Sequence, residues 1–243
     1  MSESFHNSSG NKLLAALPRE DYERLLPYLE SVFLDFKQYL YLPNQPIEYV
    51  YFPLDGIISL LTVLGDGGTI EVATVGNEGM IGIPVLLGVD QLPAETMVQV
   101  PGKALRMQVD VFKREVPVGS SFHKLLLLYV QARVNHLMQS AGCNRLHSIE
   151  QRCCRWLLLT QDRVATDEFP LTQEFLSQML GVRRASVSEV AATLQKEGLI
   201  RYNRGKMKVI DRERLKATSC ECYQVFTEEY ERILGFPPIK NEV

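Results

Sequence analysis

The residues from 171 to 210 contain the pattern that most narrows the possible folds of this 243-residue chain. Thr172 stands at the N-cap position of a short amphipathic stretch, and Glu174 places a negative charge in its first turn, where the helix dipole favours it. Gly181 ends the stretch, as glycine commonly does because it adopts a left-handed conformation. A second stretch with apolar residues at helical spacing runs from Arg183 to Glu197. The sequence therefore predicts two helices joined by a tight turn.

Two short runs typical of β-strands follow the second helix, at 198–202 and 206–210. The residues between them, Asn203-Arg204-Gly205, are suited to a hairpin turn. A helix-Gly-helix pattern alone is a weak signal, because any helical hairpin can show it. Followed directly by a basic hairpin, it predicts a winged helix-turn-helix that binds duplex DNA.

The charged and polar residues of this module suggest how such DNA contacts are divided. Arg183 and Arg184, at the head of the second helix, are our candidates for guanine contacts, because arginine bonds guanine O6 and N7 in a bidentate way. The other candidates near that end of the helix are Ser186, Ser188 and Glu189. Phosphate contacts are expected from the first helix's N-terminus and from the hairpin, through Thr172, Gln173, Arg201, Arg204 and Lys206.

The charge distribution supports a nucleic-acid partner. The chain has a net charge of -3, yet residues 145–216 carry 14 Lys/Arg against 9 Asp/Glu, while residues 1–144 carry 10 against 15. Clustered positive charge attracts the phosphate backbone, so a basic block matters more than the whole-chain balance. The same count also fits a solvated basic surface without a partner.

The region from about 32 to 112 has the texture of a β-rich domain. Short β-branched and aromatic runs, such as 49–52, 57–63 and 69–75, alternate with Gly and Pro, which favours a β-sandwich or jelly-roll barrel. The Gly-Asp-Gly-Gly stretch at 65–68 is expected to form a hairpin turn. A short helical lead, marked by leucines around Pro18, precedes the strands, and we assign residues 1–116 to this domain.

Residues 117–146 are predicted to form one long helix of roughly 25 residues, spanning about 37 Å. It is longer than a small barrel needs, so part of its apolar stripe is expected to pack against a second copy of the chain. The alternative is a core helix within one chain. Ser148 and Gln151 fit a capping box, so a helix-turn-helix domain is expected from 147 to 218, with a C-terminal tail at 219–243.

Several other classes of protein are disfavoured. The longest apolar candidate, 116–130, is interrupted by polar residues, so we expect no membrane span and a cytoplasmic protein. We find no catalytic motif and expect no enzyme. The five cysteines lack C-x-x-C spacing, so we expect no metal site or cofactor. Cys153-Cys154 and Cys220/Cys222 could be redox sensors, but we favour buried small apolar residues.

The arrangement resembles the cyclic-AMP receptor protein and fumarate-nitrate regulator (CRP/FNR) superfamily over nearly the full length. The resemblance rests on Tyr51-Phe52-Pro53, Gly79-Met80-Ile81-Gly82, the long helix, and the motifs at 171–174, 181–184 and 198–200. It implies an α+β fold with an N-terminal β-roll sensor like a cyclic-nucleotide-binding jelly roll, a dimerisation helix and a C-terminal winged helix-turn-helix. It also implies a homodimer on palindromic promoter DNA, and contact with RNA polymerase.

The chain departs from the family pattern in its sensor. The Gly-Glu-Leu and Arg-Ser/Thr phosphate cassette of relatives that bind cyclic nucleotides is replaced by Gly82-Ile83-Pro84 and Ala94-Glu95, and a glutamate would repel phosphate. We therefore expect a small-molecule effector or signal other than cyclic AMP. No cysteine precedes Cys143, which excludes the family's N-terminal iron-sulfur site. His123, His136 and His147 are expected to be surface or interface residues rather than haem ligands.

The sequence thus favours an effector-responsive, DNA-binding transcription regulator. The alternative is a ligand-binding regulatory module whose helix-turn-helix contacts protein rather than DNA.

Overall fold

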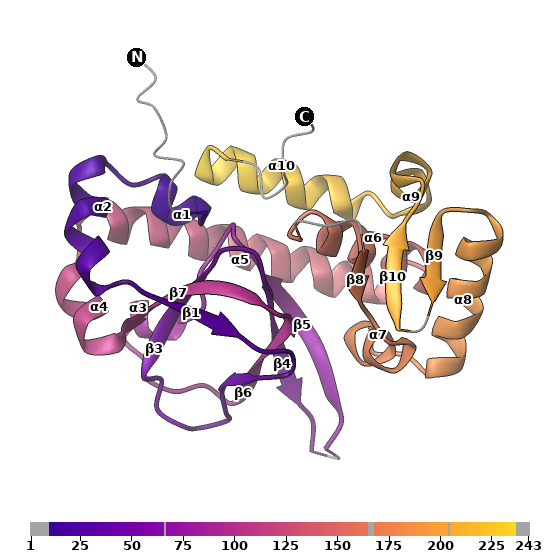
Figure 1. The fold of residues 1–243 in the computed structure, drawn as a ribbon, viewed down its shortest axis with the longest axis horizontal. Coiled ribbons are helices and arrows are strands. Elements are labelled where there is room, and N and C mark those ends of the chain that lie inside the picture. The colour runs from indigo at the N-terminus through magenta and orange to yellow at the C-terminus, as the bar shows by residue number, and fades with distance from the viewer. Residues whose placement is uncertain (1–9, 66, 165–167, 204, 237–243) are drawn as a thin grey trace.

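The computed structural model describes residues 10–65, 67–164, 168–203 and 205–236. Its elements form a β-rich N-terminal domain, a long central helix and a smaller C-terminal domain with its own three-stranded sheet (Figure 1). The predicted α+β fold is confirmed. In the described residues, no helix is both long and apolar enough to cross a membrane.

The helical lead consists of α1 (Lys12–Ala15), α2 (Arg19–Leu25) and a 3-10 turn at Leu26–Tyr28. Asn11 fixes this lead to the β-domain. Its side-chain oxygen accepts from the backbone N–H groups of Leu13 and Leu14, and its amide donates to the carbonyls of Pro53 and Gly79, both at 2.9 Å. Because Asn11 is fully buried, these bonds replace the water that its amide loses.

Two antiparallel sheets form the β-roll. One has the strand order β1-β7-β3 and the other β2-β6-β4-β5. The strands are β1 (Glu30–Leu34), β2 (Tyr39–Tyr41), β3 (Tyr49–Pro53), β4 (Ile57–Val63), β5 (Thr69–Val75), β6 (Ala94–Val100) and β7 (Gly102–Gln108). The expected hairpin between β4 and β5 is confirmed by their antiparallel pairing, although Asp66 at its turn lies outside the described residues.

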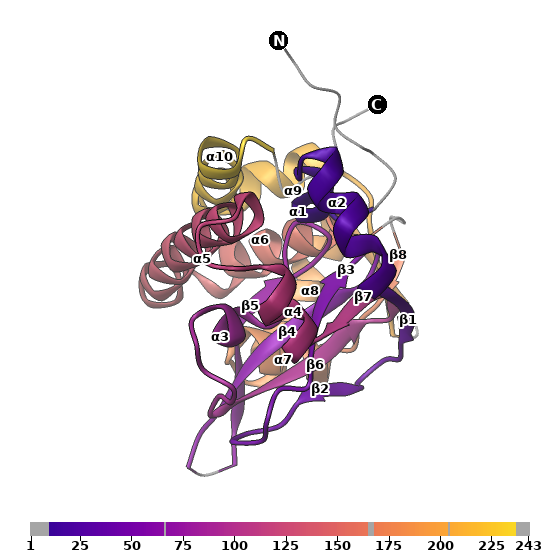
Figure 2. The same cartoon turned by 90° about the vertical axis from the view of Figure 1, so that its left-hand side faces the viewer.

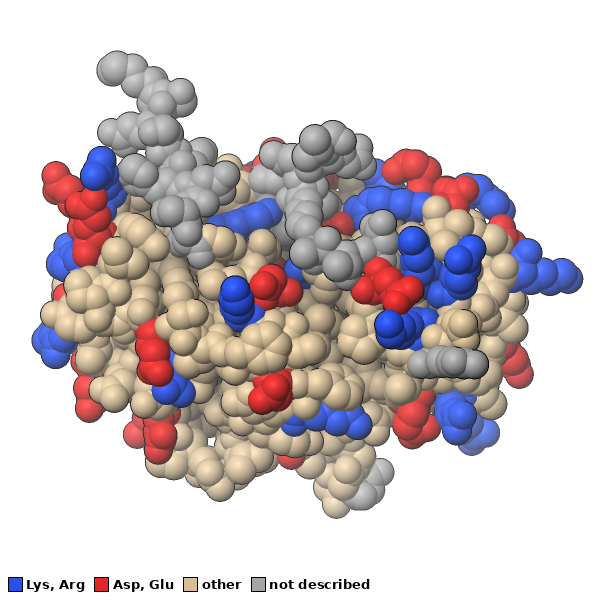
Figure 3. All heavy atoms as spheres, in the orientation of Figure 1, with Lys and Arg blue, Asp and Glu red and all other residues tan. Residues whose placement is uncertain are grey.

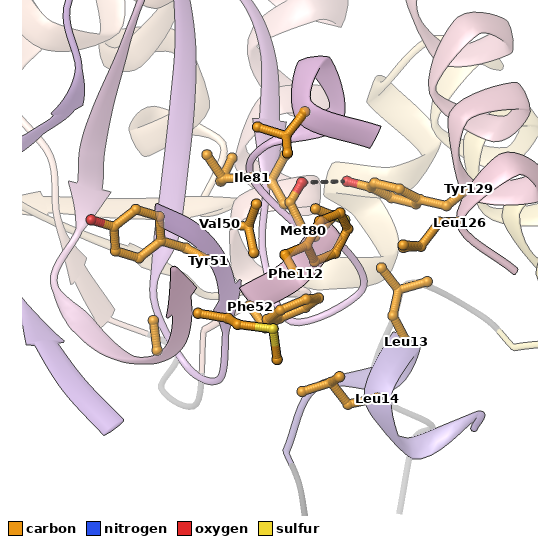
Figure 4. Close-up of a cluster of buried hydrophobic side chains, with 14 of the residues drawn as sticks. Leu13, Leu14, Val50, Tyr51, Phe52, Met80, Ile81, Phe112, Leu126 and Tyr129 are labelled. Carbon is orange, nitrogen blue, oxygen red and sulfur yellow. Dashed lines mark hydrogen bonds between the residues drawn. The ribbon is translucent and has the colours of Figure 1, made fainter. Parts of the chain in front are cut away.

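The main core fills the space between the β-roll and the helices that cover it. Phe52 of β3, Met80 and Leu126 are almost completely buried there, with Leu13 and Leu14 of the helical lead closing one side (Figure 4). Tyr129 joins the core and donates from its hydroxyl to the Met80 carbonyl at 3.3 Å.

Three helices follow or interrupt the strands: α3 (Ile83–Leu86), α4 (Val109–Glu115) and α5 (Ser121–Leu146). The predicted long helix is confirmed by α5, which has 26 residues. Ser120 caps it by accepting from the His123 N–H at 3.1 Å. α5 lies along the β-roll and continues toward the C-terminal domain (Figure 1). In the view nearly along its axis, α10 (Cys222–Leu234) lies above α5 (Figure 2).

The C-terminal domain contains the predicted winged helix-turn-helix. Its elements are α6 (Ile149–Gln161), β8 (Glu168–Pro170), α7 (Gln173–Leu180), α8 (Arg184–Lys196), β9 (Ile200–Asn203), β10 (Lys206–Val209) and α9 (Arg212–Thr218). The Ser148–Gln151 capping box is present. The sheet order β8-β10-β9 shows that β8, which the sequence analysis did not predict, pairs with the hairpin we call the wing (β9–β10).

The segment that the sequence analysis assigns as a C-terminal tail contains a helix. Residues 222–234 form the 13-residue helix α10 (Cys222–Leu234), which lies along α5 (Figure 1). His136 of α5 is buried against Phe226, with ring centroids 3.6 Å apart, and Asn135 donates to Glu229 at 2.8 Å. The helix forms because its apolar residues recur every three or four positions and face α5.

A buried ion pair joins the two domains. Arg163, just after α6, donates from Nη2 and Nε to Glu78 of the β-roll at 2.9 and 3.0 Å. The Glu78 side chain is fully buried and that of Arg163 is 3% exposed. Burial would raise the pKa of Glu78, but the Arg163 guanidinium outweighs it, and the pKa lies below its usual value.

Candidate nucleic-acid interface

The helix-turn-helix is assembled by the local features that predicted it. Thr172 caps α7 by accepting from the Phe175 N–H at 3.1 Å. Gly181 has a φ of 63°, and the N–H of Val182 returns to the Ser177 carbonyl at 3.0 Å, which closes the end of α7. Arg183 occupies the N-cap position of α8. The turn therefore fixes the position of the α8 N-terminus relative to α7.

The residues at the head of α8 divide into two groups. Arg183 and Arg184 are exposed, and neither forms an ion pair within the described part of the chain. Glu189 is exposed as well. Ser188 instead donates to Gln173 Oε1 at 2.7 Å, which links the heads of α7 and α8, and Ser186 is half-buried. The two arginines thus have their guanidinium groups available to a partner.

The wing carries further positive charge beside the two helices. Arg201 is exposed on β9, whereas Lys206 on β10 pairs with Glu168 of β8 at 3.2 Å. Arg204, at the turn of the wing, lies outside the described residues. Lys208, which the sequence analysis did not single out, is half-buried on β10. Lys and Arg side chains, mixed with acidic ones, are visible where β9, β10 and α9 reach the surface (Figure 3).

A surface hollow of about 640 Å³ lies between the head of α8 and the β4–β5 hairpin. Arg183 and Arg184 line one side, and Gly67 and Thr69 of the hairpin line the other. The β-roll therefore lies close to the residues predicted to contact bases.

The interior of the β-roll offers little room for a nucleotide. A cavity of about 60 Å³ is lined mainly by apolar side chains, among them Leu60, Val75 and Met80. Small-molecule sites usually measure roughly 300–1,000 Å³. Arg133 reaches the cavity, but it already donates to the Thr74 carbonyl at 2.8 Å.

The histidines partly differ from expectation. His136 was expected at a surface or interface, but it is buried between α5 and α10 in the chain itself. Burial, aided by Arg133, holds its pKa well below the ordinary value, so it is neutral at pH 7. His123 is half-buried near the start of α5.

The cysteines form one group that the sequence analysis missed. Cys153 and Cys154 are buried in α6, as expected, and burial raises the pKa of Cys154 to about 12. Cys220 and Cys222 are buried too. They meet Cys143 and His147 at the C-terminal end of α5, with all four ligand atoms within 4.8 Å of one another. The expectation of no metal site rests on the spacing of cysteines along the sequence, which does not show that these four residues meet in the fold.

The helix-turn-helix and the overall fold both have known relatives. Residues 151–218 match the family model of the Crp-like helix-turn-helix domain. At the level of sequence, no curated protein matches the chain.

Solved structures resemble the fold over most of the chain. FixK2 from Bradyrhizobium japonicum is 15% identical, with a TM-score of 0.67 over 79% of this chain and 98% of that one. A protein described as a Crp/Fnr-family transcriptional regulator from Eubacterium rectale is 16% identical, with a TM-score of 0.66 over 87% and 99%. A CRP-family regulator from Thermus thermophilus is 18% identical, with a TM-score of 0.63 over 86% and 100%. At these identities the structures establish the fold.

Proposed function

The chain carries a Crp-like helix-turn-helix domain within the fold of the CRP/FNR regulators, and we propose on this basis that it is a transcription regulator that binds palindromic promoter DNA as a homodimer. The observation that carries the proposal is the pair Arg183 and Arg184 at the head of α8, which are exposed and form no ion pair with any described residue. In this type of motif the second helix enters the major groove with its N-terminal residues toward the bases.

The base contacts follow from this orientation. Arg183 and Arg184 would each bond a guanine edge, with a discrimination of about 1–3 kcal/mol per good bidentate pair. Glu189, one turn further along α8, can accept from a cytosine amino group. Ser186 and Ser188 complete the surface, although Ser188 must then share its hydroxyl with Gln173.

Phosphate contacts from the N-terminus of α7 and from the wing would hold α8 in the major groove. Thr172 and Gln173 lie at the N-terminus of α7, where free N–H groups and the helix dipole attract anions. Arg201 is available on the wing, and the Lys206 ammonium would exchange Glu168 for a phosphate. Arg204 is retained in this set from its sequence position alone.

Dimerisation is assigned to the exposed face of α5. Leu127, Val134 and Met138 are 44%, 43% and 70% exposed and lie on one side of the helix, opposite the side that packs on α10. Seven- and four-residue spacing of apolar side chains is typical of a helix that pairs with another. Two parallel copies of α5 would place one α8 in each half of a two-fold symmetric site.

We assign the regulatory signal to the β-roll, with an effector other than cyclic AMP. The small apolar cavity and Glu95 in the expected phosphate position support this assignment. The β4–β5 hairpin beside Arg183 and Arg184 offers a direct path from the β-roll to the DNA-binding surface. Contact with RNA polymerase is part of the proposal because the family resemblance implies it.

The decisive experiment replaces both arginines. Duplexes selected from a random pool would be titrated with the wild type, with the Arg183→Ala/Arg184→Ala variant, and with Arg19→Ala, an exposed arginine of α2, as the control. We expect the double variant to lose at least tenfold in affinity for selected duplexes while the control keeps it. Unchanged DNA affinity in the double variant would instead support a helix-turn-helix that contacts protein.

A further inference from the structure

Four potential metal ligands converge where the long helix meets the C-terminal domain. Cys143 lies near the end of α5, His147 is its C-cap, Cys220 lies between α9 and α10, and Cys222 is the first residue of α10. Three sulfurs and one imidazole nitrogen constitute a Cys₃His set, which is a common donor set for structural zinc. We propose that these four residues bind one Zn²⁺ ion.

The distances between the donor atoms agree with one tetrahedral ion. Zn–S bonds of about 2.3 Å and Zn–N bonds of about 2.0 Å place two sulfurs about 3.8 Å apart and a sulfur and a nitrogen about 3.5 Å apart. The Cys143 and Cys220 sulfurs are 3.6 Å apart, and Cys222 Sγ is 3.6 Å from His147 Nδ1. All four atoms lie within 4.8 Å of one another, so small side-chain rotations would bring every ligand within bonding distance of one ion.

The same distances disfavour two other uses of the cysteines. All five cysteines are free thiols, and 3.6 Å between Cys143 and Cys220 is far longer than the roughly 2.05 Å of a disulfide. A four-iron cluster occupies the volume between its ligands, which requires the donor atoms to stand much further apart than they do here.

The residues around the ligands are arranged as the surroundings of a metal site usually are. The other imidazole nitrogen of His147, Nε2, lies 3.2 Å from a carboxylate oxygen of Glu221, so that Nδ1 is left as the ligand atom. A carboxylate on the far nitrogen of a metal-bound histidine fixes its tautomer and ring orientation. Gln139 donates from its side-chain amide to Cys222 Sγ at 3.1 Å, which would stabilise a thiolate.

The charge of the site is balanced by α6. Three thiolates and one dication leave a net charge of -1, which is costly in a buried place without a cation nearby. Arg152 and Arg155, both 8% exposed, interact electrostatically with Cys143 and Cys220. The Nε atoms of both arginines are buried without hydrogen-bond partners among the described residues. Arg152 also donates from its Nη atoms to the carbonyls of Asn144 and Leu180, and the Arg155 guanidinium lies over the Phe226 ring. Both arginines thus hold positive charge near the cysteines, where it would offset the negative charge of a loaded site.

The location gives the ion a structural role. It would tie α10 and the α9–α10 segment to the end of α5, and hence hold the helix-turn-helix domain to the dimerisation helix. Since the thiols lose their protons on binding, the affinity should rise with pH.

The test measures metal directly and does not involve DNA, so its failure is separable from failure of the proposed function. The full chain is unfolded with a chelator under reducing conditions, refolded with Zn²⁺ or with Co²⁺, and freed of excess ion. We expect one equivalent of zinc per chain by elemental analysis. The cobalt form should show the visible absorption of tetrahedral Co²⁺ and a strong thiolate-to-cobalt band in the near ultraviolet.

Variants assign the ligands. Cys143→Ala, Cys220→Ala, Cys222→Ala and His147→Ala should each change the cobalt spectrum and weaken Zn²⁺ binding at least tenfold in competition with a chromogenic chelator. Cys153→Ala and Cys154→Ala, equally buried but outside the site, are the matched controls and should bind one equivalent unchanged.

Three results would overturn the proposal. The first is less than a tenth of an equivalent of zinc in the folded wild type. The second is a cobalt spectrum that stays the same in the four ligand variants. The third is a protein that takes up no metal and forms a Cys143–Cys220 disulfide on mild oxidation. The wild-type stoichiometry needs no variant, so the test holds even if a ligand variant fails to fold.

Discussion

Trp156 of α6 donates from its indole Nε1 to Oε1 of Glu71 on β5 at 2.9 Å. This bond crosses from the helix-turn-helix domain to the β-roll. Glu71 also accepts from the Ser59 hydroxyl at 2.7 Å, so both carboxylate oxygens are engaged. Since Trp156 is the only tryptophan in the chain, its fluorescence reports on the contact between the domains.

The pH dependence of this contact follows from Glu71. Burial is the dominant influence on the Glu71 carboxyl and raises its pKa to about 7. The hydrogen bonds from Ser59 and Trp156 favour the charged form and offset part of this rise. Between about pH 4.5 and pH 7, Glu71 is therefore protonated in the folded state and ionised in the unfolded state. Its contribution to the stability of the fold falls as the pH rises through that range. The Glu71→Gln variant stays neutral at every pH and should not lose stability in this range. Because Glu71 is half-buried, we expect the loss in the wild type to be on the order of 1 kcal/mol.

Urea unfolding at pH 5.5 and pH 8, followed by Trp156 fluorescence, measures this effect. The stability of Glu71→Gln relative to the wild type should increase with pH. A difference between the two proteins that is the same at both pH values would show that Glu71 does not titrate in this range.

The Glu78–Arg163 pair should be strongly sensitive to loss of one partner. Arg163→Met leaves the fully buried Glu78 carboxylate uncompensated, which typically destabilises a protein by about 3–5 kcal/mol. Since Arg163 holds the pKa of Glu78 below its ordinary value, the pair stabilises the fold above about pH 4.5 and loses its effect as the pH falls. Chemical unfolding at neutral pH measures the loss. The Glu78→Gln/Arg163→Met double variant should be more stable than Arg163→Met alone, and equal or lower stability would contradict this account.

An alanine at Gly181 should destabilise the fold more than an alanine at a glycine in open space, because Ile70 must move to make room for it. A Cβ at Gly181 would lie 2.6 Å from Cδ1 of Ile70 on β5, and the φ of 63° is already unfavourable for alanine. Gly88→Ala is the matched control, because its φ is 83° and nothing lies within 4 Å of the added atom. Thermal unfolding should show a larger loss for Gly181→Ala than for Gly88→Ala. The extra loss of stability in Gly181→Ala over Gly88→Ala should become smaller when Ile70 is also replaced by alanine. An extra loss that stays the same would show that β5 does not contact the turn between α7 and α8.

The exposed face of α5 should determine the oligomeric state. Met138→Asp places a charge in the proposed dimer contact and should shift the protein to monomers, as measured by sedimentation velocity. Val118→Asp, at a residue that is 90% exposed just before α5, should leave the dimer intact. A Met138→Asp protein that sediments like the wild type would place the dimer contact elsewhere.

The helix-turn-helix was predictable because its signals are local. Thr172, Gly181 and the Ser148–Gln151 pair each act within a few residues, and each has the predicted structural role. The β4–β5 hairpin and the length of α5 were predictable for the same reason. The contacts assigned to Arg183, Arg184 and the wing residues are still predictions.

The parts that were missed depend on tertiary contacts or on a pattern that was passed over. Tyr223, Phe226 and Tyr230 recur at helical spacing, and this signal could have revealed α10. The meeting of Cys143 with Cys220 could not be read from spacing, because 77 residues separate them and only the packing of α10 on α5 brings them together. Likewise, the burial of His136 depends on Phe226 of α10.

Selection of bound duplexes from a random pool by the purified full-length chain tests the central claim most directly, with and without cell extract as a source of effector. We predict enrichment of two inverted half-sites whose centres are about 10 base pairs, or ~34 Å, apart, bound by a dimer with an affinity that falls steeply with salt. Enrichment of no sequence under either condition, or binding by a monomer that grips all duplexes equally, would contradict the account.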